Sequence, residues 1–123
     1  MSADAVIARR RAERERLLGL ARQFVATLDS RLAMRAAVVF GSVARGDFNR
    51  WSDIDLLIVA DRVPADHRRR LDAIGEWPPG VQPFVWTSEE WQVARRRGNP
   101  IAIEAVGSGV WLLGSREELE RPQ

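Results

Sequence analysis

The sequence predicts an α/β fold in which a mixed β-sheet of about four strands carries helices packed mainly on one face. Two observations lead to this prediction. Four short apolar runs have the length and composition of strands, and segments with a helical spacing of apolar residues alternate with them. The chain has 123 residues without a linker, a repeat or a low-complexity stretch. We therefore expect a single domain over residues 1–123.

The first half of the chain is expected to contain a long helix and the two most regular strands. Over residues 4–28, apolar residues of the second half recur every three or four positions, which predicts one amphipathic helix with Asp4 as its cap. The runs AAVVF (36–40) and DLLIVA (55–60) are of strand type. A second helix is expected over 64–74, with a proline near its start.

The second half, residues 81–114, is expected to begin and end with a strand and to hold two helices between them. The run VQPFVWT (81–87) is the first of these strands, and Pro83 favours either an edge position or a later start of the strand, because proline cannot donate to a strand ladder. An acidic tail follows the last strand. Thr87 or Ser88 is expected to cap the first of the two helices, and Gly98 is expected to end it. Pro100 lies in the first turn of the second helix, and VWLLG (110–114) is the final strand.

Composition excludes several classes of protein. The chain has no cysteine, so disulfides and thiolate metal sites are excluded. No apolar stretch approaches the roughly 20 residues that span a bilayer, and the charged N-terminus is unlike a signal peptide, so we expect a cytoplasmic protein without membrane contact. Arginine supplies every basic side chain, and the net charge is +2. The arginine runs lack interleaved aromatic residues, which favours solvated helix faces over a nucleic-acid partner.

Two aspartates stand at the start of the second strand. Asp53 and Asp55 flank Ile54, and because strand side chains alternate between faces, both carboxylates are expected on the same face. Neighbouring carboxylates repel each other unless a cation lies between them. A set of oxygen ligands without histidine or cysteine favours Mg²⁺ or Mn²⁺. The pair therefore indicates a site for a divalent cation.

A glycine and a serine end the first strand. Gly41 and Ser42 open a short turn, SVAR, that is expected to be helical. Glycine lets a phosphate approach the backbone, the exposed amides of a helix start attract an anion, and Ser42 adds a hydroxyl donor. A phosphate-binding turn and a pair of carboxylates are the parts of a metal-dependent nucleotidyl-transfer site. A P-loop and a dinucleotide-binding fingerprint are excluded, since their lysine and glycine patterns are missing.

The segment 36–60 resembles a known motif. GSVARG followed by SDIDLLIV is similar to the minimal nucleotidyltransferase (MNT) domains of the DNA polymerase beta superfamily, in which ten residues separate Gly-Ser from Asp-x-Asp. Ser42 and Asp53 have this spacing. The segment VWTSEEWQVARRRGNPIAIEAVGSGVWLLG resembles the second half of the same domains, so the resemblance covers roughly residues 15–114. It implies the nucleotidyltransferase fold.

The resemblance also implies a role for each matching residue. Gly41 and Ser42 would hold the β- and γ-phosphates of a nucleoside triphosphate, with ATP the expected one. Asp53 and Asp55 would bind Mg²⁺ or Mn²⁺ and act as the catalytic carboxylates. An acceptor hydroxyl, which a partner protein could carry, would then attack the α-phosphorus and release pyrophosphate.

Three neighbouring residues have two interpretations each. Arg45 either helps to bind the phosphates or is a surface arginine. Ser52, which we group with the nucleotide-binding residues, caps or orients the turn into Asp53 rather than reacting. Trp51 either stacks on a base or packs against the protein, and packing is the preferred interpretation.

The chain departs from the motif at one position. The family carries a third metal carboxylate on the next strand, and counting back from Thr87 that position holds Gln82. An amide can coordinate a cation through its oxygen, but it brings no charge and cannot act as a base. Glu76 and Glu104 are candidates to replace the missing carboxylate. Whether the domain is a nucleotidyltransferase enzyme therefore depends on Gln82.

This departure favours a second hypothesis, in which the domain is a weak or inactive nucleotidyltransferase-fold module that binds a partner. Many minimal domains resemble MntA-like antitoxins of two-gene toxin–antitoxin modules, whose other member is an all-helical HEPN ribonuclease. A homo-oligomer is a further option. Tryptophans could serve as interface hot spots or fill the core, which we expect for Trp86 and Trp111. The residues concerned are Trp77, Trp86, Trp91 and Trp111.

Overall fold

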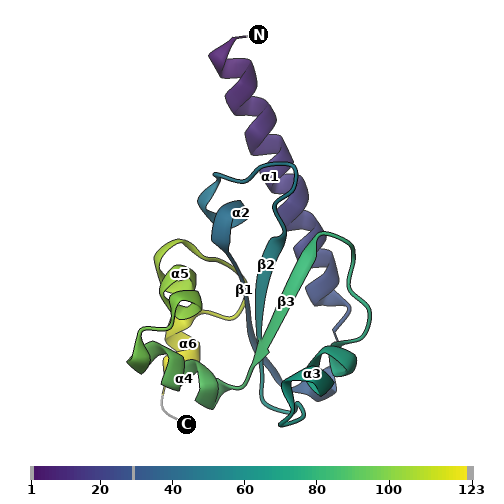
Figure 1. Cartoon of the computed structure of the whole chain (residues 1–123), viewed down its shortest axis with the longest axis vertical. Helices are drawn as coiled ribbons and strands as arrows, with labels where there is room; N and C mark the ends of the chain where they lie inside the picture. Colours follow the sequence, from purple (N-terminus) through teal and green to yellow (C-terminus); the bar gives the residue numbers. More distant parts are fainter. Residues whose placement is uncertain (1, 29, 122–123) are drawn as a thin grey trace.

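The computed structural model describes residues 2–28 and 30–121, and it consists of a four-stranded sheet with helices on both faces (Figure 1). A 3₁₀ turn at Ser30–Leu32 precedes the first strand. The strands are β1 (Met34–Phe40), β2 (Ile54–Ala60), β3 (Val81–Trp86) and β4 (Val110–Leu113). The α-helices are α1 (Ala3–Ala26), α2 (Gly41–Arg45), α3 (His67–Ile74), α4 (Ser88–Arg97), α5 (Pro100–Ser108) and α6 (Arg116–Glu120).

The sheet has the strand order β3-β2-β1-β4. β1 is antiparallel to β2 and to β4, whereas β2 is parallel to β3. This mixed sheet, with helices between its strands, confirms the α/β class. β3 lies at an edge, as Pro83 predicted, because an edge strand tolerates a residue without an N–H group.

Helices cover both faces of the sheet, which corrects the expectation that they pack mainly on one. β1 and β2 are apolar at consecutive positions, so each face presents side chains that must be buried. α1 and α3 cover the face of Val39 and Leu56, and α4, α5 and α6 cover the face of Val38 and Leu57. The core therefore consists of two clusters, one on each side of the sheet.

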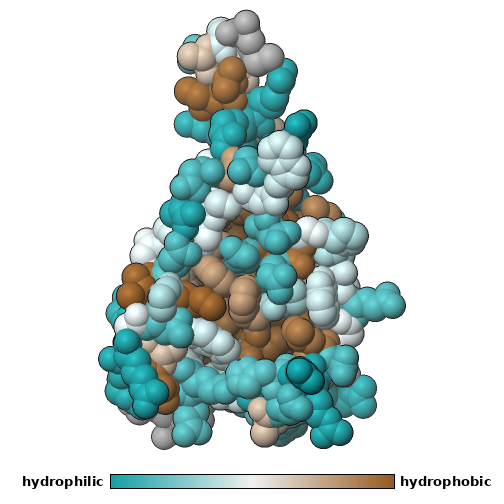
Figure 2. Space-filling model, viewed as in Figure 1, coloured by the Kyte–Doolittle hydropathy of each residue, from teal (hydrophilic) through white to brown (hydrophobic). Residues whose placement is uncertain are grey.

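The long helix α1 is only half covered. Its buried residues, Leu18, Ala21 and Phe24, all lie in its second half. The first half projects beyond the sheet, and Figure 2 shows mainly hydrophilic surface there with an apolar patch near the end. Val6 and Ile7 on this half are exposed. Among the described helices, none has the combination of length and apolar character needed to cross a bilayer.

Several helix ends differ from the expectation. Ser2, rather than Asp4, caps α1, because its hydroxyl accepts a hydrogen bond from the N–H of Ala5. α3 begins at His67 behind the cap Asp66, three residues after the predicted start. The acidic tail forms α6, whose Leu119 is buried against the α4–α5 layer. Local pattern predicted α1 and α3, whereas α6 lies where an acidic tail was expected.

The tryptophans divide into a core group and an exposed group. Trp91 is fully buried, and its ring contacts those of Trp86 and Trp111, which are partly buried against the same cluster. The expectation that Trp86 and Trp111 serve the core is confirmed. Trp77 is partly exposed, and Trp51 is the most exposed large apolar side chain of the described residues.

Candidate functional site

The chain turns sharply at the end of β1, directly against the start of β2. Gly41 has a positive φ of 77°, a conformation that only glycine adopts without strain. A Cβ atom at this position would lie 2.4 Å from Oδ2 of Asp55. The glycine therefore lets the backbone of the Gly-Ser turn pass against the Asp55 carboxylate.

Replacing Gly41 with alanine is expected to weaken ATP binding by about tenfold or more and to destabilise the fold by about 1–3 kcal/mol, because the new methyl group displaces Asp55 and the backbone is strained. Calorimetry with Mg²⁺-ATP and thermal unfolding measure the two effects. Gly46→Ala is the matched control: Gly46 also has a positive φ, of 92°, but no atom lies within 4 Å of its virtual Cβ. Equal loss of ATP binding in both variants would contradict the prediction.

The two carboxylates lie in different environments. Asp53 is exposed immediately before β2, and Asp55 is half-buried as the second residue of the strand. Burial raises the pKa of Asp55, and the neighbouring carboxylates of Asp53 and Glu104 raise it further, whereas Arg45 opposes this. The pair therefore carries an electrostatic cost that a divalent cation would relieve. These residues fit such an ion.

Four polar side chains of this region have no intramolecular partner. Within residues 2–28 and 30–121, no hydrogen bond or ion pair involves the side chains of Ser42, Asp53, Asp55 or Gln82. Folding leaves their oxygen atoms free for a ligand. This contrasts with Asn49 and Ser52 of the segment 41–53, which we call the motif loop, because these two residues bond to each other.

The structure places Gln82 beside Asp55. The two residues are paired in the parallel register of β2 and β3, and paired residues of neighbouring strands point to the same face. Among the described residues, no three aspartate, glutamate, histidine or cysteine side chains are grouped as a metal site. The third carboxylate position is therefore an amide.

Neither predicted substitute for the missing carboxylate completes the set. Glu76 lies in the loop before β3, where it lines a surface pocket with Asp72 and Trp77. Glu104 lies on α5, where its carboxylate forms an ion pair with Arg45. Glu104 is nevertheless close enough to Asp55 to raise its pKa. It adds negative charge to the site without joining a metal-binding group.

Arg45 joins α2 to α5. Its guanidinium is bonded to Glu104 and, at 3.2 Å from Nε, to Oδ2 of Asp47. It is close enough to Asp55 to lower the pKa of that residue. The side chain is thus near the carboxylates, as the phosphate-binding interpretation requires, and is held there by two acidic residues.

The loop into Asp53 is closed by its own hydrogen bonds. The hydroxyl of Ser52 accepts a hydrogen bond from the N–H of Asn49 at 3.0 Å, and Oδ1 of Asn49 accepts one from the N–H of Trp51 at 2.8 Å. Ser52 therefore caps this turn, as expected. The packing expected of Trp51 is wrong: its ring is 77% exposed and lies under the guanidinium of Arg50.

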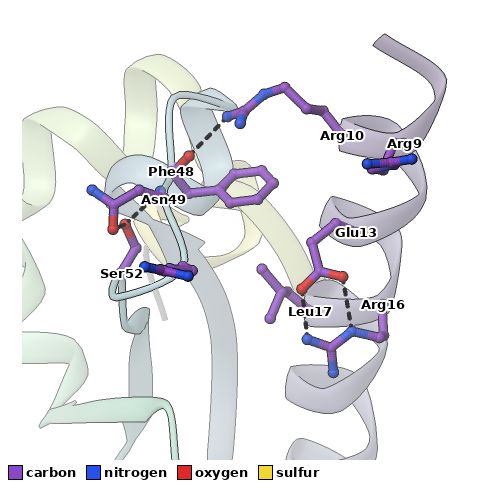
Figure 3. Close-up of a pocket in the computed structure, with 9 residues that line it drawn as sticks. Arg9, Arg10, Glu13, Arg16, Leu17, Phe48, Asn49 and Ser52 are labelled. Carbon is purple, nitrogen blue, oxygen red and sulfur yellow. Dashed lines mark hydrogen bonds and ion pairs between the residues drawn. The ribbon is translucent and has the colours of Figure 1, made fainter. Parts of the chain in front are cut away.

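Two arginines of α1 hold the motif loop, and the sequence did not single them out. Arg14 donates to the carbonyl oxygens of Val43 and Ala44 at 3.0 and 2.8 Å. Arg10 donates to those of Gly46 and Phe48 at 3.0 and 2.8 Å, and Figure 3 shows it reaching from the helix to the loop. Their separation of four residues puts both on one helix face, which was the available signal.

Comparison with solved structures shows the same fold. A proposed nucleotidyltransferase from Sulfolobus solfataricus superposes with a TM-score of 0.62 at 24% identity, over 83% of this chain and 84% of that one. A toxin–antitoxin solved with AMP-PNP superposes with a TM-score of 0.54 at 16% identity, over 83% of this chain and 77% of that one. At these identities, the likeness establishes the fold. No curated protein sequence matches the chain.

Comparison with protein families assigns the motif region. The model of the nucleotidyltransferase domain matches residues 21–84, just over half of the chain. The matched segment contains Gly41, Ser42, Asp53 and Asp55, and it also includes the departure at Gln82. The chain therefore belongs to the nucleotidyltransferase domain family.

Proposed function

We propose that the chain binds a nucleoside triphosphate together with Mg²⁺ or Mn²⁺ and transfers its nucleoside monophosphate, AMP from ATP, to an acceptor hydroxyl. The observation that carries this proposal is the close approach of the Gly41 turn to Asp55, which brings the backbone of the Gly-Ser turn against one of the two carboxylates. The free oxygen atoms of Ser42 and Asp53 support it.

Each residue has a defined task in this reaction. The Gly41 backbone and the Ser42 hydroxyl bind the β- and γ-phosphates, and Arg45 exchanges its ion pairs with Glu104 and Asp47 for a bond to a phosphate oxygen. Asp53 and Asp55 hold the divalent cation, which when bound neutralises negative charge on the triphosphate. The acceptor oxygen bonds to the α-phosphorus as the bond to the bridging oxygen breaks, and pyrophosphate leaves. The hydroxyl proton passes to solvent, because the amide of Gln82 cannot accept it.

The acceptor is proposed to lie on a protein partner, an all-helical protein of the HEPN type. Support comes from the solved toxin–antitoxin with AMP-PNP, which has the same fold. The resemblance of the motif to MntA-like antitoxins points the same way. In this arrangement, the partner supplies the hydroxyl that the small domain does not position by itself.

A second candidate function is that of a binding module with little or no catalytic activity. The amide of Gln82 beside Asp55 favours it, because the third charge of the site is missing. Such a module would still bind nucleotide through the Gly-Ser turn and would still bind its partner.

Calorimetry tests the proposal directly. With Mg²⁺ present, ATP is expected to bind with an affinity at least about tenfold higher than in EDTA, since the cation offsets the charges of both carboxylates and phosphates. Absence of ATP binding, or equal binding in EDTA, would refute it. Incubation with α-labelled ATP and a HEPN-type protein then separates the two candidates. Labelling of the partner identifies the enzyme, and complex formation without labelling identifies the binding module.

A further inference from the structure

A pocket lies between α1 and the motif loop (Figure 3), and neither Gly41 nor Asp55 is among its lining residues. Its volume is about 500 Å³. Three of the arginines that line it, Arg9, Arg10 and Arg16, come from the helix, and Arg50 comes from the loop. We call this the α1–loop pocket.

The positive charge of the pocket is only partly compensated. Its single acidic residue, Glu13, is paired with Arg16 at 2.6 Å. Arg10 bonds to backbone carbonyls, which leave its charge in place. Neither Arg9 nor Arg50 has an acidic partner among the described residues. Three guanidinium groups thus remain without a counter-charge, and guanidinium matches carboxylate geometry in two parallel hydrogen bonds.

We propose that the α1–loop pocket binds an acidic segment of the protein partner. This inference extends the proposed function and rests on its assignment of a protein partner. The apolar neighbourhood favours a protein over a nucleic acid. Val6 and Ile7 are exposed on the same projecting half of α1, and mixtures of arginine and apolar side chains are typical of protein interfaces. The guanidinium of Arg50 lies over one face of the exposed Trp51 ring, at 4.4 Å.

The position of the pocket links this segment to the reaction. Ser52 lines the pocket and directly precedes Asp53. Arg10, on the helix side, holds the carbonyls of Gly46 and Phe48 in the same loop. An acidic segment bound here therefore lies against the loop that ends at Asp53. It would anchor the acceptor-bearing partner beside the nucleotide site.

A labelled peptide of about twelve alternating glutamates and serines tests the pocket on the full chain by fluorescence anisotropy, with a glutamine peptide as its neutral counterpart. The double variant Arg9→Glu, Arg50→Glu is expected to weaken binding of the glutamate peptide by about tenfold or more. The matched control is Arg68→Glu, Arg69→Glu, which makes the same charge change on exposed residues of α3. It is expected to leave binding within about twofold of the wild type.

Three results would overturn the inference. The glutamate peptide could fail to bind the wild type, or both double variants could weaken it equally, which would indicate a general charge effect. A single-stranded RNA of equal charge could also bind more tightly than the peptide and be lost in the Arg9, Arg50 variant, which would indicate a nucleic-acid surface. ATP calorimetry separates this inference from the proposed function. Peptide binding at the pocket without Mg²⁺-ATP binding would refute the latter alone.

Discussion

Replacing Asp55 with asparagine is expected to make the metal-free protein more stable at neutral pH while removing most of its Mg²⁺-dependent ATP binding. Burial, Asp53 and Glu104 raise the pKa of Asp55. The folded chain therefore binds this proton more tightly than the unfolded chain, and stability is lost as the pH rises through the folded-state pKa. Asparagine keeps the shape without the charge, but it removes a carboxylate that we propose binds the cation.

For Asp55→Asn, the expected rise in melting temperature is about 2–4 °C at neutral pH, and its affinity for ATP in the presence of Mg²⁺ is expected to fall by about a hundredfold or more. The stability gain should vanish at acidic pH, where Asp55 is protonated in both states, and should shrink in excess Mg²⁺. In the wild type, ATP affinity with Mg²⁺ should fall as the pH falls through the raised pKa, because protons compete with the cation. Thermal unfolding and calorimetry over about pH 3–8 measure these effects.

Asp72→Asn is the control for this experiment, because Asp72 is an exposed aspartate on α3. It should change neither the melting temperature nor ATP binding. A destabilised Asp55→Asn variant at neutral pH would show that the carboxylate forms a favourable interaction in the fold. Unchanged Mg²⁺-dependent ATP binding by Asp55→Asn would show that Asp55 is not a ligand of the cation.

Replacing Gln82 with aspartate is expected to increase AMP transfer to a HEPN-type acceptor by about a hundredfold or more, the scale of one well-placed electrostatic group. The register places residue 82 directly beside Asp55, so the new carboxylate would complete the set of three and could accept the hydroxyl proton. The same change should lower the melting temperature without metal, because a third negative charge further raises the pKa of Asp55. Added Mg²⁺ should restore that stability.

Gln82→Asn is the matched control, since asparagine has the size of aspartate and no charge. It should transfer AMP no faster than the wild type and should not gain stability from Mg²⁺ beyond the wild-type response. Transfer rates measured with α-labelled ATP decide the outcome. If the aspartate and asparagine variants are equally slow, charge at this position is not what limits the reaction.

Local patterns predicted most of the secondary structure. The apolar runs became β1 and β2, because continuous apolar sequence between turn residues is typical of buried strands. Thr87 caps α4 with a capping box, and Gly98 ends it in the left-handed conformation. Pro83 predicted an edge strand. Each of these features depends on a few neighbouring residues, which is why sequence reasoning found them.

Long-range contacts decided what the pattern missed. The helix cap is a local exception: Asp4 and Ser2 are both good caps, and it is the hydroxyl of Ser2 that accepts a hydrogen bond from the N–H of Ala5. The consecutive apolar positions of β1 and β2 indicate that both faces are buried, but which helix covers which face depends on how the chain crosses the sheet. The exposure of Trp51 and the ion pair of Arg45 with Glu104 likewise follow from where distant segments meet.

The sequence by itself determined the family, the Gly-Ser and Asp-x-Asp spacing and the departure at Gln82, because these are properties of residue type and separation. Only the tertiary structure showed that Gly41 lies against Asp55, that Gln82 is its strand neighbour and that Glu104 pairs with Arg45 instead of completing the carboxylate set. It also showed that Arg10 and Arg14 attach α1 to the motif loop. Such contacts join residues far apart in the chain, and only the packing of helices on the sheet brings them together.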